Sequence, residues 1–197
     1  DTMAKMAKAA EMGGAIGIRS NGPDDIKNIK DSIDLPIIGL NKIDYEGYEV
    51  YISPSIEDIK PIIEAGADMI AIDATKQSRP YEIEDLVEYI HSQNKLVLAD
   101  VSTYEEAINA QRLNCDAVAI TMVSYTSYTK DVKLPAFELL EQLVKDLDIP
   151  VIAEGNFNTP EAARKAMDLG AHAVVVGSAI TRPQIITKKF YEAIHND

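Results

Sequence analysis

Residues Asp148–Pro183 read DIPVIAEGNFNTPEAARKAMDLGAHAVVVGSAITRP, and this stretch decides the fold. Two short apolar runs, Val151–Ala153 and Ala173–Val176, have the composition of parallel strands that are covered on both faces. Thr159-Pro160 begins a helix between them, and Leu169-Gly170 ends it. The stretch therefore predicts a strand–helix–strand unit. The right-handed crossover of such units puts the turns that follow both strands at the same end of a parallel sheet.

Each of these two turns contains a glycine followed by a polar residue. Backbone N–H groups in such turns bind anions, and in barrel enzymes the loops after the seventh and eighth strands commonly bind phosphate. We interpret this end of the sheet as a phosphate-binding site made by Gly155, Asn156, Gly177, Ser178 and Arg182. The alternative is that the two glycines only permit tight turns.

The composition limits the kinds of partner. The chain has 197 residues, so we expect a single domain over 1–197. Its 32 acidic and 19 basic side chains give a net charge of −13, which disfavours nucleic acid and anionic membranes as partners. No apolar run approaches the roughly 20 residues of a membrane span, and no signal peptide is visible, so we expect a cytoplasmic protein. The histidines have no metal-ligand spacing, and we predict no bound metal.

A weak internal repeat supports a barrel. The segments EMGGAIGIR, EAGADMIAID, RLNCDAVAIT and DLGAHAVVVG each join a helix end to an apolar strand, which indicates a parallel α/β architecture. The predicted strands lie at 15–18, 36–40, 69–72, 95–99, 117–120, 151–153 and 173–176. A TIM (β/α)8 barrel has eight strands, and this chain begins with a predicted helix over 2–12, so we expect a barrel that lacks its first strand. An open doubly wound sheet is the alternative, although its glycine-rich fingerprint is absent from the first turn.

Polar residues stand where the predicted strands end. They are Arg19, Lys42, Asp73, Asp100, Thr121 and Glu154. The strand ends of a barrel converge on one mouth, where barrel enzymes carry out catalysis. Any one of these residues could be an ordinary strand-end polar group, but the set favours a functional site. A lysine among carboxylates, near a phosphate site, suggests proton transfer on a phosphorylated carbonyl compound. The segment 43–52 is expected to extend a strand or to cover the mouth.

A series of motifs, in order along almost the whole chain, makes the sequence recognisable. IGIR, PIIGLNK, IAIDAT with SRP, LADVST, SYTSYT, VIAEGN and VVGSAITRP resemble the N-acetylmannosamine-6-phosphate 2-epimerase family. The resemblance implies a (β/α)8 barrel of the ribulose-phosphate-binding type that needs no organic cofactor and acts as a homodimer. It also implies conversion of N-acetylmannosamine 6-phosphate to N-acetylglucosamine 6-phosphate in sialic acid and amino-sugar catabolism.

The resemblance further implies roles for individual residues. Lys42 is then the base at C2 of the sugar, and Glu154 assists ring opening or proton relay. The residues implied to hold the sugar are Arg19, Asp73, Asp100 and Tyr125. The sequence TMVSYT around the tyrosine departs from the glycine that the family often has just before it.

The family also has a glutamine on its first strand that contacts the substrate, and this chain has no counterpart of that strand. We therefore expect a truncated form that is less stable than a full-length parent and weakly active or inactive. Its open sheet edges are expected at 15–18 and 173–176.

The implied chemistry is coherent with these residue types. The C2 hydrogen becomes acidic only when the sugar ring opens and C1 is an aldehyde. A free lysine has a pKa of about 10.4, so a lysine base must be shifted toward neutrality, and burial and nearby carboxylates shift it in opposite directions. Inversion needs protons on both faces of C2, either from a second acid or from one lysine after the enediolate turns. The alternative functions are an inactive sugar-phosphate-binding barrel and another phosphosugar isomerase or synthase of the same barrel class.

Overall fold

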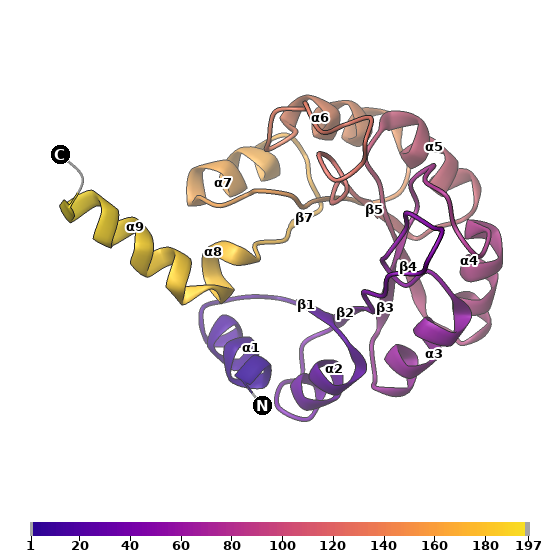
Figure 1. Cartoon of the computed structure of the whole chain (residues 1–197), viewed down its shortest axis with the longest axis horizontal. Helices are drawn as coiled ribbons and strands as arrows, with labels where there is room; N and C mark the ends of the chain where they lie inside the picture. Colours follow the sequence, from indigo (N-terminus) through magenta and orange to yellow (C-terminus); the bar gives the residue numbers. More distant parts are fainter. Residues whose placement is uncertain (1, 196–197) are drawn as a thin grey trace.

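Seven parallel strands form one sheet in which each strand pairs with its successor in the chain. The structure, a computed structural model, describes residues 2–195. The strands are β1 (Ile18–Asn21), β2 (Ile37–Leu40), β3 (Met69–Asp73), β4 (Leu96–Asp100), β5 (Ala117–Ala119), β6 (Val151–Ala153) and β7 (Ala173–Val174). The sheet curls until β7 turns back toward β1 (Figure 1). This nearly closed TIM barrel confirms the predicted fold class.

Helices cover the outer face of the sheet. The helices of residues 2–195 are α1 (Thr2–Met12), α2 (Pro23–Lys30), α3 (Ile56–Glu64), α4 (Ile83–Ser92), α5 (Tyr104–Arg112), α6 (Phe137–Asp146), α7 (Pro160–Asp168), α8 (Ser178–Thr181) and α9 (Pro183–His195). The first seven surround the sheet, whereas α9 points away from it (Figure 1) and has no buried residue. Among the described helices, none combines the length and apolar character that crossing a membrane requires.

Two apolar cores lie on the two faces of the sheet. The larger one fills the space between the strands and the helices, and the smaller one lines the inside of the barrel. The strands therefore bury both faces, which explains their continuous apolar sequences. Gly39 in β2 is required by the outer packing, because a Cβ there would lie 2.4 Å from Cγ2 of Ile62 and 2.7 Å from Cβ of Ala67.

The first predicted strand is wrong in position. The sequence predicts it over 15–18 with Arg19 just beyond its end, whereas β1 spans Ile18–Asn21. The chain is still turning after α1, since Gly14 has a φ of +95° and Ile16 is 79% exposed. Pairing of Ile18 with Ile37 of β2 then sets the register. Arg19 is therefore the second residue of β1, inside the barrel, rather than a residue beyond the strand.

Both edges of the sheet are open in the described part of the chain. β1 pairs only with β2, and β7 pairs only with β6. The sequence predicts open edges at these same two ends. β7 is shorter than predicted, with two half-buried residues, because regular pairing with β6 stops soon after Val174.

Candidate active site

Arg19 and Asp100 form a two-pronged contact inside the barrel. Nη1 and Nη2 of Arg19 donate to Oδ1 and Oδ2 of Asp100 at 2.9 and 2.6 Å. The Thr121 hydroxyl donates to the same Oδ1 at 2.6 Å. Burial acts to lower the pKa of Arg19, but the charges of Asp100 and Glu154 outweigh it and raise that pKa above its ordinary value. The guanidinium therefore stays charged in a buried position.

Glu154 lies beside this pair, one residue after β6. Its Oε2 is 2.9 Å from Nη1 of Arg19. The contact lacks hydrogen-bond geometry, and this buried oxygen has no hydrogen-bond partner within residues 2–195. Burial raises the pKa of Glu154 to about 7; Arg19 acts against this rise and Asp100 adds to it. At neutral pH the carboxyl group can therefore both hold and release a proton, as a proton-transfer group requires.

Asp73 ends β3 and stands in register with Asp100 of β4. Its Oδ1 accepts hydrogen bonds from the N–H and the hydroxyl of Thr75 at 3.0 and 2.6 Å. Its Oδ2 is buried and has no hydrogen-bond partner in the described structure. Burial raises the pKa of Asp73 above its usual range, with the hydrogen bonds from Thr75 acting against the rise. One carboxyl oxygen thus has unused acceptor capacity.

Lys42 lies at the entrance of the barrel, two residues after β2. It is exposed, and its backbone N–H donates to Oδ1 of Asn21 at 2.8 Å. The segment after it leaves the sheet and returns, because Lys42 and Ile52 form an isolated antiparallel bridge. Its positive charge acts to lower the pKa of Glu154, so the ammonium group and the carboxyl group are close enough to interact.

Tyr51 is a residue of this mouth that sequence reasoning missed. The Nζ of Lys42 lies 5.7 Å from the centroid of the Tyr51 ring. Burial raises the pKa of Tyr51 to about 12, with further contributions from Asp73 and the 65% exposed Tyr125. The phenol therefore stays protonated. The sequence Val50-Tyr51-Ile52 could have indicated this residue. Side chains along an extended segment point alternately to its two faces, so the buried Val50 and Ile52 put Tyr51 on the opposite face.

The two turns predicted to bind phosphate follow neighbouring parallel strands, β6 and β7. Gly155 has a φ of +113°, a conformation that favours glycine, and Asn156 has a φ of +62°. Gly177 directly precedes α8, whose first residue is Ser178. Arg182 follows α8 and is exposed. The fold thus brings the two turns to one end of the sheet and leaves Arg182 at the surface.

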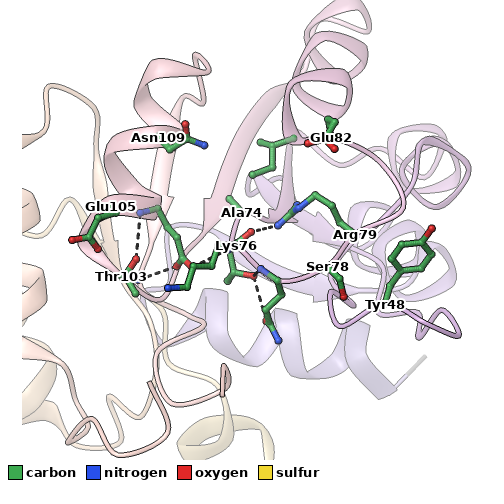
Figure 2. A pocket seen from close by; sticks show the side chains of 13 residues that line it. Tyr48, Ala74, Lys76, Ser78, Arg79, Glu82, Thr103, Glu105 and Asn109 are labelled. Carbon is green, nitrogen blue, oxygen red and sulfur yellow. Dashed lines mark hydrogen bonds between the residues drawn. The ribbon is translucent and has the colours of Figure 1, made fainter. Parts of the chain in front are cut away.

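A pocket of about 690 Å³ opens beside this mouth (Figure 2). It lies between the loop after β3 and the beginning of α5, and its lining includes Lys76, Arg79, Thr103 and Glu105. Arg19, Lys42 and Glu154 do not line it. The pocket is therefore separate from the residues that the sequence singles out for chemistry.

The chain matches a family described as "Putative N-acetylmannosamine-6-phosphate epimerase" over residues 3–196. A protein of Clostridioides difficile (strain 630), named "Putative N-acetylmannosamine-6-phosphate 2-epimerase", is 50% identical over 194 residues that cover 98% of this chain and 87% of the relative. A protein of Staphylococcus haemolyticus (strain JCSC1435) with the same name is 48% identical over 197 residues, covering 98% of this chain and 88% of the relative.

Comparison with solved structures gives the same family. The N-acetylmannosamine-6-phosphate 2-epimerase from Clostridium perfringens superposes with a TM-score of 0.93 at 48% identity, covering 96% of this chain and 84% of that one. A thiamine phosphate pyrophosphorylase from Pyrococcus furiosus superposes with a TM-score of 0.63 at 18% identity, covering 98% of this chain and 91% of that one. The second likeness concerns the fold alone.

Proposed function

Because the chain belongs to the N-acetylmannosamine-6-phosphate epimerase family, we propose that it inverts C2 of N-acetylmannosamine 6-phosphate to give N-acetylglucosamine 6-phosphate. The observation that carries this proposal is the buried group of Arg19, Asp100 and Glu154 beside Lys42 at the mouth of a TIM barrel. A carboxyl group that titrates near neutrality and an amine at the same mouth are the two proton-transfer groups that the reaction requires.

In the proposed mechanism, Glu154 first takes the proton of the C1 hydroxyl and delivers a proton to the ring oxygen, so that the bond between C1 and the ring oxygen breaks and C1 becomes an aldehyde. Lys42, once its ammonium group has given up a proton, then removes the proton from C2. The electron pair of the C2–H bond forms the C1–C2 double bond of an enolate, and the carbonyl electrons pass to the C1 oxygen. Return of a proton to the opposite face of C2, either from a second acid or from Lys42 after the intermediate turns, gives the inverted sugar. The charged Arg19 supports the step because its fixed positive charge stabilises negative charge that develops on the sugar oxygen.

Binding of the sugar and the phosphate is assigned to the rest of the mouth. We propose that Asp73, Asp100 and Tyr125 hold sugar hydroxyl groups; the free Oδ2 of Asp73 supports its part in this. The phosphate is proposed to lie on the backbone of the two turns, at Gly155-Asn156 and at Gly177-Ser178, with Arg182 turning toward it.

The proposal extends to the setting of the reaction. Family resemblance supports a role in sialic acid and amino-sugar catabolism, a cytoplasmic location and a homodimeric state.

The direct test is proton NMR of N-acetylmannosamine 6-phosphate incubated with the protein in deuterated water. An epimerase produces N-acetylglucosamine 6-phosphate in which C2 carries deuterium. A sugar-phosphate-binding protein without activity would shift or broaden the substrate resonances and leave the C2 proton in place. The second result would contradict the proposed function.

A further inference from the structure

Glu106, in the first turn of α5, is a buried carboxylate that accepts five hydrogen bonds. Its Oε2 accepts from the N–H and the hydroxyl of Ser102 at 2.7 and 2.8 Å, and from the N–H of Thr103 at 2.9 Å. Its Oε1 accepts from the N–H of Lys76 at 2.9 Å and from the hydroxyl of Tyr128. These donors belong to three successive loops, those that follow β3, β4 and β5.

Helix capping accounts for only one of these five bonds. Thr103 and Glu106 form a capping box, in which the glutamate accepts from the backbone N–H of the N-cap residue. The bonds from Ser102, Lys76 and Tyr128 go beyond that motif. Glu106 therefore joins loops that are far apart in the sequence, since Lys76 and Tyr128 lie 30 and 22 residues from it.

The loop after β3 depends on such polar contacts because one of its sides is hollow. The pocket of about 690 Å³ separates this loop from the beginning of α5, with Lys76, Ser78 and Arg79 on its lining (Figure 2). Arg79 donates to the backbone carbonyl oxygens of Asp73 and Thr75 within the same loop. The bond from the Lys76 N–H to Glu106 ties the first half of the loop to α5, whereas the carbonyl oxygen of Ser78 accepts from the N–H groups of residues 49 and 50.

Each of the three loops also carries or adjoins a residue of the proposed site. Thr75, which holds Oδ1 of Asp73, is the neighbour of Lys76 in the chain. Ser102 lies two residues after Asp100, and Tyr125 stands in the loop that contains Tyr128. Displacement of any of these loops would therefore move a group that is proposed to hold the sugar.

We propose that Glu106 is a positioning residue of the epimerase site, which holds the loops after β3, β4 and β5 so that Asp73, Asp100 and Tyr125 keep their places at the mouth. The inference rests on the proposed function for what these three residues do. The arrangement of the loops around Glu106 stands independently of it.

A carboxylate is needed because every partner of Glu106 donates. A glutamine at this position has one acceptor oxygen and one NH₂ group. If its NH₂ group takes the Oε2 position, it faces the N–H groups of Ser102 and Thr103. If it takes the Oε1 position, it faces the N–H of Lys76. The hydroxyl groups can turn to accept, but the backbone N–H groups cannot, so one loop loses its backbone hydrogen bond to residue 106 in either orientation.

The test compares Glu106→Gln with Glu105→Gln. Glu105 is the exposed neighbour in the same helical turn, so its substitution makes the same change of charge near the helix N-terminus. We expect Glu106→Gln to lower kcat/KM for N-acetylmannosamine 6-phosphate by about 10- to 100-fold, because misplacement of substrate-holding groups has effects of this size. Glu105→Gln should stay within twofold of the unsubstituted protein.

Two further readouts separate positioning from general loss of structure. Inhibition by inorganic phosphate should be unchanged in Glu106→Gln, since the two turns after β6 and β7 make no contact with Glu106. Amide hydrogen exchange followed by NMR should become faster at Lys76, Ser102 or Thr103 while the amides of β6 stay protected. Equal kcat/KM and equal exchange in the two variants would overturn the inference.

Two other outcomes, failure of the proposed function and failure of the variant to fold, can be told apart from the results above. If the unsubstituted protein does not turn over the substrate, the proposed function fails, while the exchange measurement still tests the three loops. If Glu106→Gln does not fold, Tyr128→Phe removes one donor and keeps the carboxylate. That variant should lose several-fold in kcat/KM with faster exchange in the loop after β5, and identity with the unsubstituted protein would overturn the inference.

Discussion

The guanidinium of Arg19 on β1 binds both carboxylate oxygens of Asp100 on β4, across 81 residues of sequence and two intervening strands. Both side chains are almost wholly out of solvent, with 8% and 0% of their area exposed. Such a contact is possible only when the sheet curls into a barrel and brings the inner faces of distant strands together. The pair thus joins the fold to the proposed chemistry, since Glu154 contacts the same guanidinium.

We predict that Arg19→Met lowers the free energy of unfolding by about 3–5 kcal/mol, because it leaves the buried carboxylate of Asp100 without its partner. The unfolding free energy of Arg19→Lys should lie between those of Arg19→Met and the unsubstituted protein, since lysine keeps the charge but loses the two-pronged contact. Urea denaturation measures the change. The matched control is Arg164→Met, which removes the exposed ion pair with Asp168 on α7 and should change stability by less than about 1 kcal/mol. A loss below 1 kcal/mol in Arg19→Met would contradict the buried pair.

The raised pKa of Glu154 predicts a dependence of stability on pH. Burial holds this pKa at about 7, above the ordinary value of 4.5. Between these two values the unfolded chain has lost the proton and the folded chain retains it, so stability from this group falls as pH rises from about 4.5 to 7 and then levels off. Glu154→Gln cannot titrate at this position, so its unfolding free energy should lack this fall. Urea denaturation at pH 5 and pH 8 measures it; an identical pH dependence in the two proteins would contradict the assignment.

Phosphate recognition makes a separate prediction. N-acetylmannosamine without the 6-phosphate should be a poor substrate, because binding energy from a remote group is lost. Arg182→Gln should raise KM for the phosphorylated sugar roughly 10- to 100-fold, as expected when a charged hydrogen bond of about 1.5–3 kcal/mol is removed. Arg164→Gln, at an exposed arginine of α7 whose side chain pairs with Asp168, is the control. Steady-state kinetics on both sugars measure the effects, and equal kcat/KM for the two sugars would show that the turns bind another group.

Much of this arrangement could be predicted from local sequence patterns. Asp73 and Asp100 can be predicted as site residues because each stands at the end of an apolar run. The glycine turns after β6 and β7 can be predicted because each of them also follows an apolar run. The sequence predicts Arg19 as the residue just beyond a strand over 15–18. The structure corrects this position, since pairing of β1 with β2 starts only at Ile18 and Arg19 therefore lies within the strand.

The remainder depends on contacts that no local pattern encodes. The contact between Arg19 and Asp100 needs the curvature of the whole sheet. The bond from the Thr103 N–H to Glu106 belongs to a local capping-box motif, but the bonds from Lys76 and Tyr128 arise only when three loops meet. Tyr51 was hidden in a segment that leaves the sheet and returns through one isolated bridge at Ile52.

The central claim is that Lys42 exchanges the proton at C2, and solvent deuterium uptake at that carbon in Lys42→Met tests it most directly. We predict that uptake, followed by proton NMR of N-acetylmannosamine 6-phosphate, falls by about 100- to 10,000-fold. Binding of the sugar phosphate should persist, and Lys27→Met, at an exposed lysine of α2, should exchange at the normal rate. Uptake by Lys42→Met at a rate close to that of the unsubstituted protein would contradict the account.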